Sequence, residues 1–171
     1  MALHSARLNR VVKATKGEMD FWSEGVSLER DSGTTIAALA QDGAVARWRL
    51  ARSCKRTADR LASLSKPHYR SAISRYYYSM YHAMRSVVYV SHGGDDHEEH
   101  SKLPGHVPSD FPDQTWQTRL KNARLTRNAA DYDPYPVQAA YWAARARTMK
   151  AEATSLLAIA KAYLRTKGCA P

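Results

Sequence analysis

The chain has 171 residues, of which 44% are hydrophobic and 25% are charged, and its formal net charge is +10. This length suits a single domain that buries roughly 68–70% of the surface of its unfolded chain. Two cysteines provide neither a disulfide framework nor a zinc ligand set, and we expect a reducing, cytoplasmic setting. No apolar run is long enough to span a membrane, and no secretory apolar segment follows the first residue.

Residues 1–33 predict an N-terminal appendage that is partly helical. Apolar residues favour a short amphipathic helix over 3–16, and glycines punctuate the segment that follows. The main domain is then expected over 34–171. Thr34 or Thr35 predicts the start of a helix that runs to about Ser63, with a break or bend at Gly43.

Pro67 indicates the first turn of another helix, which should end near Ser91. Its apolar stripe at helical spacing comprises Ile73, Tyr77, Met80, Met84, Val87 and Val88. Four further tyrosines surround the stripe: Tyr76, Tyr78, Tyr81 and Tyr89. Such a helix is typical of a core or a dimer interface, and the alternative is a tyrosine surface that stacks on bases.

Residues 92–112 form a long connection rich in glycine and proline, and loops of this length tend to be functional or mobile. The window 92–113 holds six acidic residues and one lysine, a net charge of −5, so the remainder of the chain carries +15. That remainder would attract a polyanion such as RNA. The loop also holds His92, His97, His100 and His106, but their spacing matches no metal motif. We therefore expect no metal and no cofactor, and interpret the loop as an acidic shield over a basic face.

Asp113 predicts the cap of a helix through about Asn128, and Pro134 and Pro136 mark its end. A last helix is expected over 137–166, with Lys167-Gly168 after it. No period-2 strand pattern occurs. The sequence therefore predicts an all-α bundle of four to five helices with an N-terminal appendage.

In the helix predicted from Asp113 to about Asn128, an arginine lies at a position that should be apolar. Trp116, Leu120, Ala123 and Arg127 follow one another at spacings of four, three and four and so share one helix face. A guanidinium cannot lose its proton and is costly to bury without partners. Asn128, Asp131 and Tyr132 lie within reach, so Arg127 is either a structural ion-pair lock or part of a phosphate site.

Arg119, Lys121 and Arg124 add positive charge on the same helix, and we predict that they contact nucleic-acid phosphates. The alternative is a solvated face with modest ion pairs. The sequence contains no glycine-rich phosphate loop, nucleophile elbow or recognisable cysteine–histidine arrangement. These absences exclude most common enzyme classes.

Two motifs together resemble the HEPN family of small helical domains associated with nucleotides and RNA. The first is the run Arg127-Asn128-Ala129-Ala130-Asp131-Tyr132-Asp133. The second is the aromatic run from Ser74 to Arg85, in which His82-Ala83 follows the tyrosines. Their order along the chain also fits, and the resemblance covers about residues 34–166.

The resemblance implies a bundle of four or five helices and a homodimer in which two arginine motifs face each other. Ribonuclease members cut RNA without a metal, using an arginine, the adjacent polar residue and a histidine, and many are toxins paired with a nucleotidyltransferase antitoxin. Carried over to this chain, the site residues are Arg127, Asn128, Asp131 and Tyr132. Tyr132 stands at or near the position of the histidine, and a tyrosine hydroxyl with a pKa near 10 is a poorer proton shuttle at neutral pH.

Three hypotheses follow from these patterns. The first is a metal-independent endoribonuclease or toxin component that acts on RNA as a homodimer. The second is a non-catalytic HEPN module that binds RNA, a nucleotide or a partner protein such as a nucleotidyltransferase. The third is a purely structural helical adaptor. In the catalytic case Arg127 stabilises the phosphoryl charge, Asn128 orients the phosphate or the attacking hydroxyl, Tyr132 relays a proton and Asp131 holds Arg127 in place.

Overall fold

The computed structural model describes residues 2–171, with side chains described from Arg7 onward. Helices connected by turns and loops make up this part of the chain, and residues 2–171 contain no β-strand. The prediction of an all-α helical bundle is confirmed. The chain divides into two compact units, one up to Leu39 and one from Ala40 to Pro171. Within residues 2–171, no helix combines the length and apolar character that crossing a bilayer requires.

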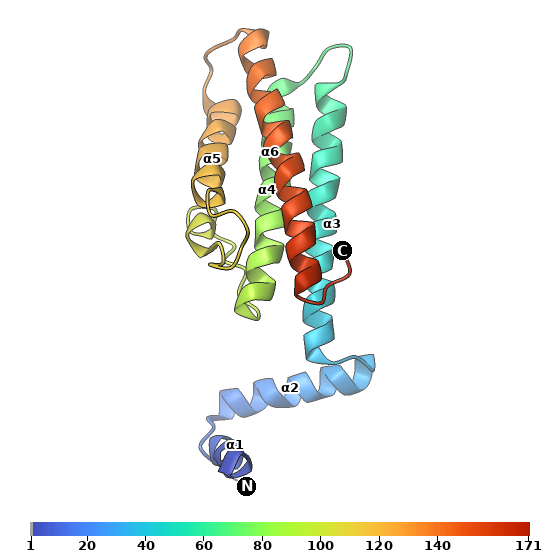
Figure 1. Ribbon diagram of the computed structural model, residues 1–171, viewed down its shortest axis with the longest axis vertical. Helices are drawn as coiled ribbons and strands as arrows, with labels where there is room; N and C mark the ends of the chain where they lie inside the picture. The colour runs from blue at the N-terminus through green and yellow to red at the C-terminus, as the bar shows by residue number, and fades with distance from the viewer. Residues whose placement is uncertain (1) are drawn as a thin grey trace. The chain divides into compact units, whose positions relative to one another are not determined.

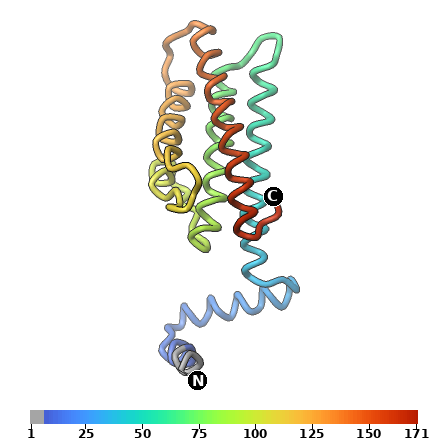
Figure 2. The backbone as a smooth tube through the Cα atoms, viewed as in Figure 1, coloured from blue at the N-terminus to red at the C-terminus, as the bar shows by residue number. Residues whose placement is uncertain are grey.

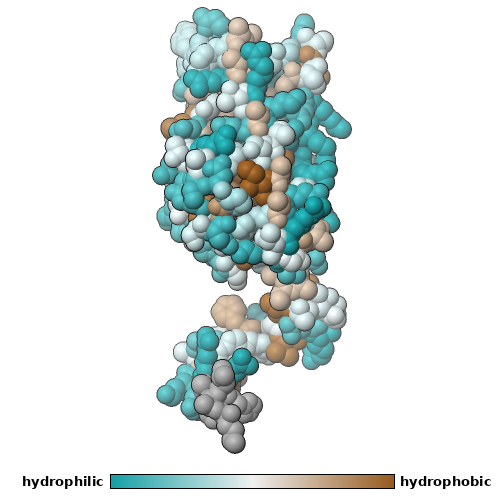
Figure 3. Space-filling model, in the orientation of Figure 1, coloured by the Kyte–Doolittle hydropathy of each residue, from teal (hydrophilic) through white to brown (hydrophobic). Residues whose placement is uncertain are grey.

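The first unit contains helices α1 (Ala2–Val12) and α2 (Lys16–Ser32) (Figure 1). The helix predicted over 3–16 ends earlier, because Thr15 begins the next one. The Thr15 hydroxyl accepts a hydrogen bond from the Glu18 amide at 3.3 Å, and the Glu18 carboxylate accepts one from the Thr15 amide at 2.8 Å. This reciprocal capping box fixes the start of α2. No residue of Lys16–Ser32 is buried, and apolar side chains reach the surface of this segment (Figure 3).

The second unit is a helical bundle (Figures 1 and 2). Its elements are α3 (Ile36–Ala62, whose first residues belong to the first unit), α4 (Tyr69–His92), the short 3₁₀ helix η1 (Leu103–His106), α5 (Trp116–Tyr132) and α6 (Ala139–Thr166). Helix α4 packs against α5, α6 and η1. Seen from the side shown in Figure 3, the unit is largely hydrophilic with a small apolar patch near its centre.

Helix α4 is the central element of this unit. Half of its 24 residues are buried, and they cover several faces of the helix rather than a single stripe. The side chains of Tyr76, Tyr77 and Tyr81 are at most 4% exposed. The interpretation of the aromatic helix as a core helix is therefore confirmed.

The predicted break at Gly43 is wrong, because α3 runs without interruption from Ile36 to Ala62. Directly after the glycine, Ala44, Val45 and Trp48 are at most 4% exposed. A glycine within a helix costs only about 1 kcal/mol relative to alanine. Burial of the apolar residues that follow it outweighs this cost and keeps the helix continuous.

The connection between α4 and α5 is more ordered than its composition predicts. It contains η1 and buries Leu103, Val107 and Phe111 in the core. Its 3₁₀ helix η1 packs against both α4 and α5, and the connection is seen beside these two helices in Figure 2. The predicted cap is also displaced, because α5 begins at Trp116. The Asp113 carboxylate instead accepts hydrogen bonds from the amide and the hydroxyl of Thr115, at 2.9 and 2.6 Å.

Candidate functional site

The candidate site lies between α4 and the second half of α5, and Arg127 is at its centre. Trp116, Leu120 and Ala123 precede Arg127 on the same face of α5 and are at most 2% exposed. The Arg127 side chain, next in this stripe, remains only 20% exposed. The packing of α5 against α4 thus holds a permanent cation at the edge of the core, where it requires polar partners.

Each edge of the Arg127 guanidinium meets a polar group of the protein. Its Nε lies 2.7 Å from Oδ2 of Asp131, but the N–H does not point along this contact, so the two form an ion pair rather than an aligned hydrogen bond. Nη1 donates to Oδ1 of Asn128 at 3.1 Å, and Nη2 donates to the hydroxyl of Tyr78 at 3.1 Å. The predicted pairing of Arg127 with Asp131 is therefore present in the structure.

Tyr132 and Tyr78 both lie against the same guanidinium. The guanidinium carbon of Arg127 is 5.6 Å from the centre of the Tyr132 ring and 5.5 Å from that of Tyr78, within the range of a cation–π contact. Tyr132 is 72% exposed. Its hydroxyl therefore remains accessible to a ligand that approaches Arg127 from solvent.

The acidic loop places His100 against the tyrosines of α4. The His100 ring stacks on Tyr81 with ring centres 4.0 Å apart, and its Nδ1 lies 2.7 Å from the Tyr77 hydroxyl. Its ring centre is also 5.9 Å from that of Tyr78, the residue that holds Arg127. A histidine from a distant part of the chain therefore joins the Arg127 cluster through a shared tyrosine.

A second histidine, His82, packs on the other side of Tyr78 with ring centres 6.3 Å apart. Burial, together with the positive charges of Arg85 and Arg47, lowers the pKa of His82 to about 4. Burial and the nearby charge of Arg127 also lower the pKa of His100. Both imidazoles are consequently neutral at pH 7, the state in which a histidine accepts a proton.

The cationic residues predicted on α5 are divided between two surfaces. Arg124 is half-buried, and among the described residues its Nε has no hydrogen-bond partner. It lies three residues before Arg127 on α5 and so shares that side of the helix, and its positive charge helps to lower the pKa of His100. Arg119 instead covers the Trp116 ring at 4.3 Å and pairs weakly with Glu152 of α6 at 3.8 Å. Lys121 is exposed to solvent.

The acidic loop is fastened to the bundle by Asp96. Both carboxylate oxygens of Asp96 accept hydrogen bonds from Nη2 of Arg85 at 2.7 Å, and Arg47 of α3 forms a second ion pair. The side chains of Arg85 and Asp96 are 12% and 13% exposed. The loop is therefore attached to two arginines of the bundle through a nearly buried ion pair, and its predicted shielding of a basic face stays a prediction.

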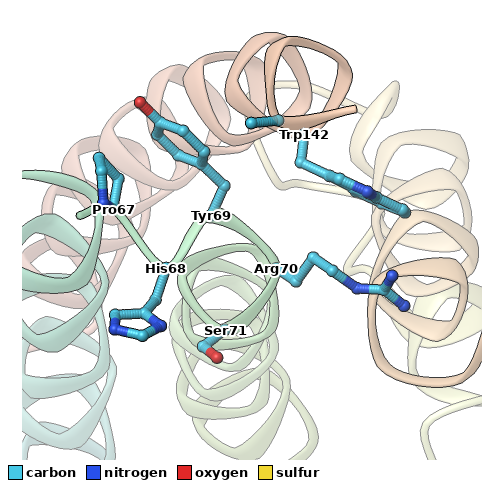
Figure 4. A pocket seen from close by; sticks show the side chains of 7 residues that line it. Pro67, His68, Tyr69, Arg70, Ser71 and Trp142 are labelled. Atoms are coloured by element: carbon cyan, nitrogen blue, oxygen red, sulfur yellow. The ribbon is translucent and has the colours of Figure 1, made fainter. Parts of the chain in front are cut away.

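Arg70 also belongs to this region, although no sequence pattern marks it as a site residue. It extends from the first turn of α4 to the end of α5 (Figure 4), where its Nε donates to the carbonyl of Ala130 at 2.7 Å and its Nη2 donates to the carbonyl of Asp133. Its guanidinium also lies over Trp142 at 4.7 Å. A cation at the C-terminal end of a helix is favoured by the helix dipole. Arg70 thereby fixes the turn of α5 that carries Asp131.

The assembled site presents two arginines beside neutral histidines and tyrosine hydroxyls, a combination suited to an anionic ligand and to proton transfer. Comparison with known proteins identifies no matching family model, no curated relative and no similar solved structure. The chemistry of this site must therefore be argued from its own residues.

Stability should depend on pH through His82. An unfolded chain protonates this histidine near pH 6.5, whereas the folded chain does so only near pH 4. Between these values the unfolded state binds more protons, so His82 lowers the free energy of unfolding as the pH falls from about 6.5 to 4. The free energy of unfolding, measured with urea at several pH values in this range, should depend less steeply on pH for His82→Gln than for the original chain. Equal slopes would contradict the burial of a neutral imidazole.

Removal of the Asp96 charge should destabilise the bundle. Asp96→Asn leaves Arg85 and Arg47 without their shared counter-ion, and breaking a buried ion pair costs about 3–5 kcal/mol. Glu99→Gln removes one charge from the same loop, but its pair with Lys102 is exposed and contributes at most about 1 kcal/mol. Urea unfolding of both variants would measure the difference. A loss below about 1 kcal/mol for Asp96→Asn would argue against the proposed fastening.

Proposed function

We propose that this chain is a HEPN-type RNA-associated protein that acts as a metal-independent endoribonuclease, in the manner of a toxin component. The observation that carries the proposal is the position of Arg127, which is held between α4 and α5 and is joined to His100 through Tyr78. The half-buried Arg124 adds a second positive charge on the same side. A phosphodiester would find a charged anchor and a neutral base in one place.

The proposed reaction is an internal transesterification of RNA. The ribose 2′-oxygen forms a bond to the adjacent phosphorus, the bond from phosphorus to the 5′-oxygen breaks, and the products carry a 2′,3′-cyclic phosphate and a 5′-hydroxyl. Neutral His100 is the proposed acceptor of the 2′-hydroxyl proton. Arg127 would stabilise the charge on the phosphoryl oxygens, and the exposed hydroxyl of Tyr132 would supply or relay a proton to the leaving oxygen.

A second function is favoured by a specific observation. The three edges of the Arg127 guanidinium already contact Asp131, Asn128 and Tyr78. A phosphate would have to displace one of these groups. The alternative is therefore a non-catalytic HEPN module in which Arg127 is a structural lock, and which binds RNA or a partner protein such as a nucleotidyltransferase.

An assay with labelled mixed-sequence RNA in EDTA tests the first proposal. The original chain should cleave the RNA and leave cyclic phosphate ends, and Arg127→Ala should lower the rate about 10²–10³-fold, as loss of an oxyanion donor typically does. Arg119→Ala is the matched control, because it removes the same charge from the same helix while its contacts face Trp116 and Glu152. It should retain the rate within a few-fold.

Two results would decide for the alternative. Intact RNA with every protein would exclude cleavage, and a large loss of unfolding free energy in Arg127→Ala would then identify Arg127 as a lock. Equal losses of cleavage in Arg127→Ala and Arg119→Ala would contradict a specific role for Arg127. In the binding case, RNA affinity should fall steeply with salt, because phosphate contacts release counter-ions.

We further propose that the chain forms a homodimer through the surface beside Arg127. Several large apolar or aromatic side chains near the end of α5 and the start of α6 are more than a third exposed: Leu125, Tyr132, Tyr135, Val137 and Tyr141. Leu125 and Tyr141 line one pocket between these two helices. Tyr132 lies against Arg127, so a two-fold axis at the Tyr132 end of this surface would bring two Arg127 clusters together, as the HEPN resemblance implies.

Light scattering coupled to size-exclusion chromatography should give twice the chain mass for the original protein. Leu125→Glu places a charge in the proposed interface and should shift the mass to that of a monomer, since burial of an unpaired charge is costly. Lys121→Glu, one turn earlier on the same helix and exposed, should leave the dimer intact. A monomer at all concentrations, or a dimer insensitive to Leu125→Glu, would refute this interface.

A further inference from the structure

Three histidines from three consecutive segments of the chain meet at the end of α4. His92 is the last residue of α4, His97 lies in the acidic loop, and His106 ends η1. Each offers one ring nitrogen, and the three nitrogens lie within 4.8 Å of one another. We propose that His92, His97 and His106 bind one divalent transition-metal ion, and that this ion is zinc.

One of these histidines already has the outer-shell partner that a metal-binding histidine normally needs. Nδ1 of His92 lies 3.0 Å from the carbonyl oxygen of Val88. A carbonyl oxygen accepts a hydrogen bond, so Nδ1 of His92 carries the proton and its Nε2 keeps its lone pair. Such partners fix the tautomer and ring orientation of ligating histidines.

The backbone of the loop is bent to bring the rings together. Gly93 and Gly94 adopt φ angles of 72° and 152° and return the chain toward the end of α4. His97 itself has a φ of 47°, a left-handed conformation that is uncommon for a residue other than glycine. Its ring stacks on that of His106 with centres 3.4 Å apart, so the two rings lie together but must turn before both can direct a nitrogen at one ion. Strain of this kind concentrates at functional sites, where the surrounding structure enforces it.

The ligand set selects the metal. Imidazole nitrogens favour zinc, copper, nickel and iron, whereas magnesium and calcium prefer oxygen ligands. Zinc commonly binds three protein ligands and a water molecule in a tetrahedron with zinc–nitrogen distances of about 2.0–2.1 Å. The nitrogens in such a site are about 3.3 Å apart, so nitrogens that now lie within 4.8 Å of one another must move closer together on binding. Asp95 or water would occupy the fourth position.

The ion would connect three segments: the end of α4, the acidic loop and η1. The same loop carries Asp96, which pairs with Arg85, and His100, which packs on the tyrosines beside Arg127. A bound ion would therefore tie together the two parts of the loop that flank His100 and the end of α4. The proposed role of the metal is structural, and no reaction step requires it.

Zinc chloride titrated into the metal-stripped full-length chain, monitored by calorimetry without RNA, tests the site. One ion should bind per chain, and His97→Ala and His106→Ala should each weaken binding at least tenfold. His68→Ala is the matched control, because it removes an exposed histidine at the start of α4, and it should bind zinc as the original chain does. Circular dichroism would confirm that all variants keep their helices.

Failure to bind zinc at a 1:1 ratio would overturn the proposal, as would equal weakening in the His68→Ala control. A second measurement is thermal unfolding, in which zinc should raise the melting temperature of the original chain but not of His97→Ala. Magnesium at the same concentration should have no such effect. Because neither experiment contains RNA, its failure would leave the ribonuclease proposal untouched.

Discussion

The structure depends on the burial of α4 on several of its faces. A helix so deeply buried would normally be apolar, yet α4 carries tyrosines, serines, histidines and arginines among its inward-facing residues. Every buried hydroxyl or charge must find a partner or pay its desolvation cost. Tyr76 finds Asp59 on α3, Tyr77 finds His100, and Tyr81 finds the carbonyl of Glu98. The positions of α3 and the acidic loop follow from these requirements, and burial raises the pKa of Tyr77 so that its hydroxyl stays protonated.

Two arginines from different helices fix the last turns of α5, which carry the candidate site. Arg70 of α4 binds the carbonyls at the end of α5, and Arg127 of α5 donates to Tyr78 of α4. The helices are thus cross-connected in both directions by charged donors, whose hydrogen bonds are stronger than neutral ones. This arrangement fixes the position of Arg127 but also engages all of its guanidinium nitrogens. Arg127 can therefore serve both as a structural lock and as a phosphate site only if RNA displaces one of these contacts, and the solvent-exposed side at Tyr132 is where RNA would approach.

The sequence predicts what is local and misses what is distant. The core stripe of α4 and the pair of Arg127 with Asp131 could be predicted because residues three or four apart share a helix face. The contacts of Arg70 with Ala130, and of Arg127 with Tyr78, join residues 60 and 49 positions apart and left no periodic signal. The predicted break at Gly43 failed for a related reason. Trp48, which follows the glycine on α3, is buried and donates a hydrogen bond to the carbonyl of Leu157 on α6, a contact between residues 109 positions apart.

The acidic loop also reduces the number of positive charges that the rest of the chain presents to solvent. The +15 outside the loop suggests a large basic surface, but Asp96 pairs with both Arg85 and Arg47 within the fold. These two arginines are therefore largely engaged inside the protein and contribute little to the attraction of a polyanion. The same loop supplies His100 to the Arg127 cluster. Any event that releases Asp96 would expose two arginines and withdraw the proposed base together, so the loop couples the charge of the surface to the integrity of the site.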